Sequence, residues 1–300
     1  MKVKEVMLEK QMNSEPEDYI TNNSGLPDAI VRAMMNDPYD KGTCDFSATE
    51  LIKPARICEL ERRHKHEIKE DAEDGLYRLY GQIAHLILER ANQVGIAEKR
   101  YYTKVGDYVI SAQMDNLSLH NEILSDYKFT SAWGFKSDEP PKPEWVAQLN
   151  IQNYILIKNG IKPRALQIVG LIRDFRLNDA KNYDNYPKKP VVVVPIEMWS
   201  LEQTEAFIMV RIHEHLRAVV DLDSVKCSKS ERWEKAETYA AMKEGRKTAV
   251  KVELSREAAQ KYVTSPDMYI QVRPGISARC EQYCKVKDFC SQYKEMTNAV

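Results

Sequence analysis

The sequence has no run of eighteen apolar residues, which is the shortest stretch that reads as a membrane-spanning helix. Its first residues, Met-Lys-Val-Lys-Glu, lack the apolar segment of a secretory signal peptide. We therefore expect a cytoplasmic protein with no membrane partner. The net charge is also close to zero, because 44 basic and 45 acidic side chains leave a formal charge of -1. This balance excludes a uniformly basic DNA-coating protein but leaves room for a local basic groove.

Disulfides are not expected either, because thiols stay reduced in the cytoplasm. The six cysteines then indicate metal binding or ordinary burial. No internal repeat or low-complexity tract interrupts the 300 residues, and 43% of them are hydrophobic, so the chain can bury a sizeable core.

One short stretch of the chain concentrates chemically useful side chains. Two runs with alternating apolar residues, 109–114 and 123–129, flank a polar segment and predict a β-hairpin. Alternation along the second strand places Asp126 and Lys128 on the same face, and Asp115 at the end of the first strand can lie beside them. Two carboxylates and a lysine can bind a divalent metal and a phosphate together. A solvated cross-strand ion pair is the simpler alternative.

Helical and strand periods alternate along the chain, which predicts an α/β fold. Ser47 and Glu50 have the spacing of a capping box, so a helix should begin at Ala48 and be interrupted by Pro54. We expect an N-terminal arm (1–46), a catalytic core (47–225) and a C-terminal helical region (226–300). The expected helices are 55–69, 76–91, 144–159 and 201–220, and the expected strands are 97–103, 109–114, 123–129, 165–175 and 190–196.

Four motifs follow one another in this part of the sequence: Gly81-x-x-x-His85, the strand with Asp115, Ile123-Leu-Ser-Asp-Tyr-Lys128, and Trp145-Val-Ala-Gln-Leu149. In this order they resemble the PD-(D/E)xK nuclease superfamily, in its RecB-like exonuclease branch, and are most similar to phage-encoded members. The resemblance spans roughly residues 47–175 and reaches the C-terminal cysteines. It implies a restriction-endonuclease-like core with a mixed central sheet flanked by helices, and helical N-terminal and C-terminal elements joined by a cysteine metal cluster.

The resemblance also implies a role for each motif residue. Asp115 and Asp126 would bind Mg²⁺ or Mn²⁺, with His85 as an additional ligand. Lys128 would lie at the scissile phosphate, where it can orient the attacking water and offset the charge that develops. Gln148 would position the lysine or the DNA. Without the motif, His85 reads more simply as a histidine on a helix packing face.

The sequence departs from the branch at one position. The branch pattern Gln-x-x-x-Tyr would place a tyrosine at 152, but this chain has Gln152, and its tyrosine is Tyr154. Two residues turn a helix by about 200°, so Tyr154 cannot replace the missing side chain on the same face. Glu98, before the hairpin, is a candidate for an outer-shell carboxylate.

The cysteines near the C-terminus form a second constellation. Cys280, Cys284 and Cys290 lie close together in the sequence. Related nucleases, including the AddB type and CRISPR-associated exonucleases, combine three such cysteines with one that precedes the catalytic histidine to bind a 4Fe-4S cluster. The resemblance therefore implies Cys58 as the fourth ligand, with Cys44 as the alternative. Four thiolates could equally bind Zn²⁺.

The expected activity is metal-dependent hydrolysis of DNA from a free end, on single-stranded or frayed DNA, and it implies partner proteins of recombination or replication. The alternatives are a site-specific endonuclease, a catalytically weak DNA-end-binding or recombination accessory protein of the same fold, and a zinc-stapled scaffold. Basic and aromatic side chains that flank the core are candidates for DNA contacts. They are Lys99, Arg100, Trp133 and Arg173.

Overall fold

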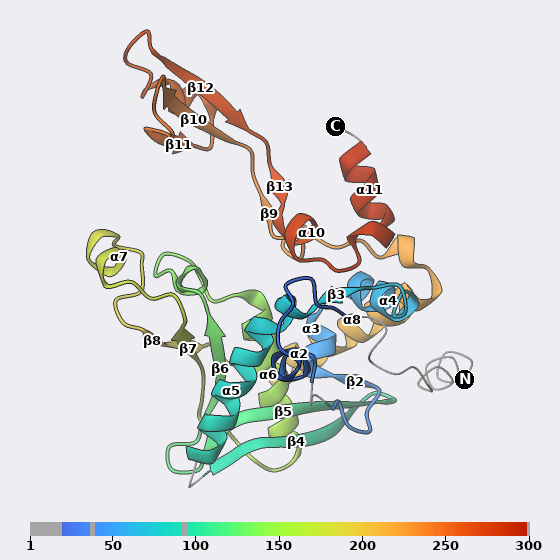
Figure 1. The fold of residues 1–300 in the computed structure, drawn as a ribbon. Coiled ribbons are helices and arrows are strands. Elements are labelled where there is room, and N and C mark those ends of the chain that lie inside the picture. The colour runs from blue at the N-terminus through green and yellow to red at the C-terminus, as the bar shows by residue number, and fades with distance from the viewer. Residues whose placement is uncertain (1–19, 37–39, 92–94, 299–300) are drawn as a thin grey trace. The chain divides into compact units, whose positions relative to one another are not determined.

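The computed structural model describes residues 20–36, 40–91 and 95–298 (Figure 1). The chain forms two compact units, one from residues 1–53 and 65–213 and the other from residues 54–64 and 214–300. The expected N-terminal arm lies partly outside the described residues. The expected boundary between core and C-terminal region is also different, because residues 54–64 belong to the same unit as the end of the chain.

A six-stranded mixed sheet forms the centre of the first unit. Its strands follow the order β2-β5-β6-β7-β8, and β4 pairs with the other edge of β5. The β6–β7 pair is parallel, whereas β4–β5, β5–β6 and β7–β8 are antiparallel. The strands are β2 (Phe46–Ser47), β4 (Gly95–Val105), β5 (Tyr108–Ser118), β6 (Ile123–Thr130), β7 (Ala165–Ile172) and β8 (Val191–Ile196).

Helices cover both faces of this sheet, which confirms an α/β fold with a mixed central sheet flanked by helices. On β6, Lys128 reaches Gln148 of α6, whereas the neighbouring Phe129 packs edge-on against Tyr80 of α5. Because successive side chains of a strand face opposite sides, α5 and α6 cover opposite faces of β6. The helices of this unit are α2 (Asp28–Met35), α3 (Ala48–Ile52), α5 (Leu76–Ala91), α6 (Pro143–Lys158), α7 (Leu177–Asn182) and most of α8 (Leu201–Val220).

Local sequence signals explain where several of these elements begin. The Glu50 N–H donates to Ser47 Oγ at 3.1 Å, and Glu50 Oε2 accepts from the Ser47 N–H at 3.4 Å, so the predicted capping box starts α3. Pro54 separates α3 from α4, as expected. Apolar side chains of α6 and the strands then form the core. Leu124, Leu149, Ile151, Ile155 and Ile168 are fully buried.

The hairpin prediction was too short on its first strand. It ended the strand before Asp115, but β5 continues to Ser118 because residues 116–118 pair with β4 from Gly95 to Ala97. Asp115 therefore lies within β5 and not in a turn. Short elements of this unit complete the description: β1 (Ile20–Thr21) pairs with β3 (Glu70–Asp71), and single 3-10 turns occur at Ala72–Gly75 and Ala132–Phe135.

The second unit corrects the expectation of a helical C-terminal region. Its middle is a three-stranded antiparallel sheet in the order β11-β10-β12, and β9 pairs with β13. The strand Met-Tyr-Ile-Gln-Val-Arg carries the aromatic and β-branched residues typical of a strand, whereas Thr-Tyr-Ala-Ala-Met-Lys consists mostly of helix-forming residues and becomes a strand through pairing. The elements are α4 (Ala55–Arg63), β9 (Glu234–Lys235), β10 (Thr238–Lys243), β11 (Lys251–Glu253), α9 (Arg256–Gln260), β12 (Met268–Arg273), β13 (Ile276–Ser277), α10 (Ala278–Gln282) and α11 (Ser291–Asn298), with 3-10 turns at Leu222–Ser224 and Lys287–Phe289.

Helix α4 ends at Arg63 and not at the predicted Lys69. Side-chain hydrogen bonds within the helix stabilise its last turn, because Arg62 and Arg63 both donate to the buried Glu59 carboxylate at 2.6–2.7 Å. In the described part of the chain, no helix is long and apolar enough to cross a membrane.

Candidate functional site

The candidate site lies where β5 and β6 separate. The two strands pair only at Asn116–Ser125 and Leu117–Leu124. Beyond these pairs the Tyr127 N–H would lose its partner, but the Asp115 carboxylate accepts it at 2.8 Å. Asp115 thus replaces a backbone acceptor at the point of separation, and this places its side chain beside that of Asp126.

Asp126 and Lys128 lie together as the alternation rule predicted. Lys128 Nζ is 2.6 Å from Asp126 Oδ2 and donates to Gln148 Oε1 at 3.0 Å. The Asp126 side chain is fully buried, yet neither of its oxygen atoms has a hydrogen bond of good geometry. The short contact with Lys128 is therefore an ion pair without proper alignment. Lys128 supplies one positive charge beside the two carboxylates of Asp126 and Asp115, and a bound cation would offset the negative charge that remains.

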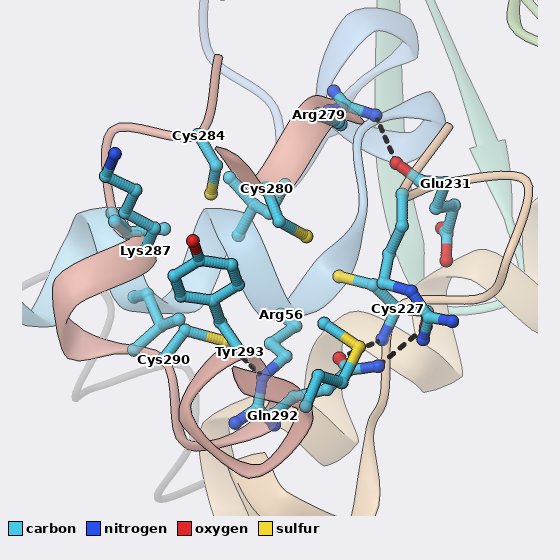
Figure 2. Close-up of a pocket in the computed structure, with 15 residues that line it drawn as sticks. Arg56, Cys227, Glu231, Arg279, Cys280, Cys284, Lys287, Cys290, Gln292 and Tyr293 are labelled. Carbon is cyan, nitrogen blue, oxygen red and sulfur yellow. Dashed lines mark hydrogen bonds between the residues drawn. The ribbon is translucent and has the colours of Figure 1, made fainter. Parts of the chain in front are cut away.

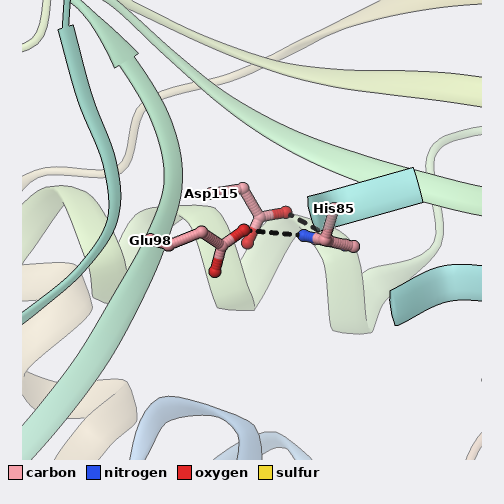
Figure 3. A group of neighbouring side chains, drawn as sticks. All are labelled: His85, Glu98 and Asp115. Atoms are coloured by element: carbon pink, nitrogen blue, oxygen red, sulfur yellow. Dashed lines mark hydrogen bonds and ion pairs between the residues drawn. The ribbon is translucent and has the colours of Figure 1, made fainter. Parts of the chain in front are cut away.

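His85 and two carboxylates form a compact group next to this pair (Figure 3). One ligand atom from each of His85, Glu98 and Asp115 lies within 4.8 Å of the other two. His85 Nδ1 is 2.9 Å from Glu98 Oε1, and His85 Nε2 is 3.9 Å from Asp115 Oδ2. The predicted ligands His85 and Asp115 are therefore brought together, with Glu98 as an additional neighbour.

Glu98 has an unusual backbone for a strand residue. Its φ angle is +47°, in the left-handed region that non-glycine residues adopt rarely and at a cost of about 1 kcal/mol or more. Hydrogen bonds fix the Glu98 side chain. Gln113 Nε2 donates to Glu98 Oε2 at 2.6 Å, and Arg100 Nη2 donates to Gln113 Oε1 at 3.0 Å. A strained residue with a fixed carboxylate is typical of a functional site.

These contacts change the protonation of the group. The hydrogen bond to Glu98 raises the pKa of His85 in spite of its burial, and the nearby carboxylates of Asp115 and Asp126 add to this rise. Burial, reinforced by the charge of Asp126, raises the pKa of Asp115 from 3.8 to about 7. Such mutual destabilisation of close carboxylates is relieved by a divalent cation.

The residues fit a hard or borderline divalent metal. Carboxylate oxygens suit Mg²⁺ and Mn²⁺, and an imidazole nitrogen is better tolerated by Mn²⁺. Asp126 supplies buried oxygens without hydrogen bonds, and Asp115 connects Asp126 to His85. Glu98 faces the other ring nitrogen of His85, which is the position of a carboxylate that orients a metal-bound histidine.

The structure explains the departure at position 152. Since β4 occupies one edge of β5, both β2 and β6 pair with the other edge, at Ile110–Ser111 and at Asn116–Leu117. Gln152 Nε2 donates to the Gln113 carbonyl at 3.0 Å in the interval between them. Tyr154 points elsewhere and donates to Glu205 Oε2 at 2.6 Å. Gln152 therefore provides a hydrogen-bond donor for a backbone carbonyl of β5. Tyr154 does not take the place of the tyrosine in the branch pattern, as the helix geometry predicted.

The predicted DNA contacts differ in how free their side chains are. Trp133 is 70% exposed, and Lys136 Nζ lies 5.0 Å from the centre of its ring. Arg173 stacks on Tyr77 at 3.7 Å, and Lys99 lies over Tyr101 at 5.2 Å. Arg100 is directed into the protein instead.

Arg100 donates to Ser111 Oγ and to Gln113 Oε1, each at 3.0 Å. These bonds make it a support of the Glu98 carboxylate. Trp133, Arg173 and Lys99 remain candidates for DNA contacts.

The C-terminal cysteines meet at a pocket of the second unit (Figure 2). Cys280, Cys284 and Cys290 line it, as predicted, but the fourth cysteine there is Cys227. Burial raises the pKa of Cys227 to about 12 and also raises the pKa of Cys280 and of Cys284, and the neighbouring thiols reinforce the rise. Binding of a metal by Cys227, Cys280 and Cys284 would displace their thiol protons.

The two cysteines proposed as fourth ligand lie elsewhere. Cys58 belongs to α4, whose Arg56, Ile57 and Leu60 line the pocket, but Cys58 itself is not a lining residue. Cys44 belongs to the first unit, where its sulfur contacts the Lys41 carbonyl at 3.3 Å and Ser111 Oγ at 3.2 Å.

Comparisons with known proteins add little to this description. No family model and no curated protein matches the chain. A solved structure described as the crystal structure of SSO0001 is similar over 62% of this chain and 82% of its own length, with 16% identical residues and a TM-score of 0.42. Interpretation of the site therefore depends on its own side chains.

Sequence reasoning missed three residues of these sites. Gln113 and Gln152 act through hydrogen bonds between segments that are distant in sequence, so no local spacing marks them. Cys227 stands alone in the sequence, more than fifty residues before Cys280. The one available signal was the count of cysteines, since Cys227 alone among the six had no assigned role.

Proposed function

We propose that this protein is a metal-dependent deoxyribonuclease that hydrolyses phosphodiester bonds from a free DNA end. The observation that carries the proposal is Asp126, a fully buried carboxylate without hydrogen bonds that lies 2.6 Å from Lys128 and beside Asp115. Such a pair of carboxylates needs a cation, and the adjacent lysine offers a positive charge to a phosphate. DNA as the substrate and attack from an end are proposed from the order of the motifs.

Each residue has a distinct role in this proposal. Asp115 and Asp126 would bind the metal together with His85, and a bound Mg²⁺ or Mn²⁺ would supply Lewis-acid activation of water and phosphate. Glu98 holds His85 so that Nε2 faces Asp115. Lys128 places its ammonium where negative charge develops on the phosphate.

Gln148 fixes the position of that ammonium. Lys128 has four flexible side-chain torsions, and the bond to Gln148 Oε1 restricts them. Gln148 itself lies on α6, which is buried along most of its length and is therefore a rigid support. The lysine is thus held between a metal carboxylate and a fixed amide.

The second unit contributes the thiol pocket. We propose that its cysteines hold an iron–sulfur cluster with a structural role. Two segments far apart in sequence line this pocket, residues 56–60 and residues 227–296. A metal centre there would fasten the pocket without taking part in hydrolysis.

The proposal is tested by DNA degradation in Mg²⁺ or Mn²⁺ with three substrates: linear duplex, linear single strand and closed circle. The wild type should degrade linear DNA and leave the circle intact. Asp126→Ala should abolish activity, and Lys128→Ala should reduce it by roughly 10²-fold to 10³-fold. Asp107→Ala and Lys162→Ala change exposed residues of the same types and should retain full activity.

Two results would redirect the proposal. Cutting of the closed circle would identify an endonuclease. DNA binding without hydrolysis in either metal would identify an accessory protein that binds DNA ends. Full activity of both Asp126→Ala and Lys128→Ala would refute the assignment of the site.

A further inference from the structure

We propose that Cys227 is the fourth ligand of the thiol-bound metal centre, together with Cys280, Cys284 and Cys290, and that Cys58 is not a ligand. The inference deepens the proposed iron–sulfur site and rests on that part of the proposed function. It is independent of whether the first unit hydrolyses DNA. All residues that carry it belong to the second unit.

Four cysteine side chains lie around one hollow. Cys227, Cys280, Cys284 and Cys290 line the same pocket (Figure 2). Cys227 is 8% exposed and Cys290 is 9% exposed. Cys280 and Cys284 are half-buried. Four cysteines around one hollow are the ligand set of a four-cysteine metal site.

Helix α4 presents a different face to the pocket from the one that carries Cys58. The residues of α4 that line the pocket are Arg56, Ile57 and Leu60. With 3.6 residues per turn, Cys58 lies roughly 150° around the helix from the middle of that face.

Hydrogen bonds hold the backbone around Cys227 in place. The Cys227 N–H donates to Gln292 Oε1 at 2.8 Å, and Gln292 Nε2 donates back to the Cys227 carbonyl at 2.9 Å. Arg232 Nη1 donates to the same carbonyl at 3.0 Å. Gln292 follows Cys290 by two residues and is 6% exposed. The two hydrogen bonds with Gln292 therefore fix Cys227 against the segment that carries the other ligands.

A buried arginine connects two of these segments. Arg56 is 1% exposed and donates Nε to Cys290 Sγ at 3.2 Å. Its Nη1 donates to the Leu222 and Val225 carbonyls at 2.7 and 3.1 Å, just before Cys227 in the sequence. Arg56 therefore holds the backbone that leads into Cys227 close to Cys290.

The test compares metal content in single variants of the full chain purified without oxygen. Iron and zinc are measured per protein by mass spectrometry, and visible absorbance reports the cluster. Cys227→Ser should lose most of the iron, whereas Cys58→Ser and Cys44→Ser should keep the wild-type amount. Loss of iron in Cys58→Ser with retention in Cys227→Ser would overturn the proposal, as would wild-type protein that binds neither iron nor zinc.

A second measurement on the wild type covers the case in which Cys227→Ser does not fold. The loaded protein is alkylated with iodoacetamide before and after the metal is removed with an oxidant and a chelator. Cys227, Cys280, Cys284 and Cys290 should become reactive only after removal, and Cys58 should react to the same extent in both states. Protection of Cys58 by the metal, or reaction of Cys227 in the loaded protein, would contradict the assignment. Nuclease activity enters neither readout, so failure here leaves the proposed hydrolysis intact.

Discussion

Replacing Asp115 with asparagine should stabilise the metal-free protein at alkaline pH. The pKa of Asp115 is raised from 3.8 to about 7 by burial and by the charge of Asp126. Between these two values the folded protein keeps a proton that the unfolded chain has released, so wild-type stability falls as pH rises. Above about pH 7 the full penalty is present, and near pH 4 it vanishes. Asparagine carries no charge and can still accept the Tyr127 N–H.

The expected size follows from the shift. Three pKa units correspond to at most about 4 kcal/mol at pH 8, since each unit is worth about 1.4 kcal/mol. For a unit of this size, each kcal/mol moves the melting temperature by roughly 2–4 °C. Asp115→Asn should therefore melt on the order of 10 °C above the wild type at pH 8 and close to it at pH 4. Added Mn²⁺ should narrow the difference between the two proteins, because a metal at 100 times its Kd stabilises only the protein that binds it, by about 2.7 kcal/mol.

The assay is thermal melting by circular dichroism from pH 4 to pH 8.5, with chelator or with Mn²⁺. Asp107→Asn changes an exposed aspartate in the turn between β4 and β5 and should follow the wild type throughout. If Asp115→Asn melts below the wild type at pH 8 without metal, Asp115 is not destabilised by Asp126. If Mn²⁺ stabilises both proteins equally, Asp115 does not bind the metal.

Three further substitutions test the supports of the two sites. Gln148→Ala should leave the melting temperature within a few degrees of the wild type but lower the hydrolysis rate roughly 10-fold to 100-fold, because Lys128 loses its fixed amide; an unchanged rate would refute this positioning role. Glu98→Gln should weaken Mn²⁺ binding by roughly 10-fold to 100-fold in titration calorimetry, since the carboxylate that orients His85 becomes neutral; wild-type affinity would exclude that role. Arg56→Met should destabilise the second unit by about 3 kcal/mol in urea, because buried carbonyls and a thiol lose their donors, and equal stability would show that water replaces the guanidinium.

Much of the first site could be predicted because its geometry is local. Alternation along a strand places Asp126 with Lys128, and the helical period places His85 on α5, so short-range rules were sufficient. The contact between Lys128 and Gln148 followed from the motif order. Asp115 lies beside Asp126 as predicted, but it lies within β5 and not at the end of the strand. The pairing of residues 116–118 with β4 extends the strand, and it depends on contacts that no local pattern shows.

The second unit was predicted less well for a physical reason. The strands between residues 234 and 277 are short and bordered by charges, and they become strands only through pairing in a sheet. Cys227 has no neighbour in sequence that reveals its partners. Its place depends on the bonds of Gln292 and Arg56, which come from opposite ends of the chain.

The membership of residues 54–64 in the second unit affects the order in which the protein can fold. Helix α4 is synthesised early, but Arg56 finds its acceptors at residues 222–225 and 290–291, which emerge late. About 150 residues of the first unit separate the two parts, and closing so long a loop costs only slightly more than closing a short one. During synthesis the first unit can thus form while α4 is still unpartnered. A chain that ends before Cys290 would lack two hydrogen-bond partners of Arg56, Cys290 Sγ and Ser291 Oγ. Truncation at the C-terminus should therefore destabilise α4, which lies near the beginning of the chain.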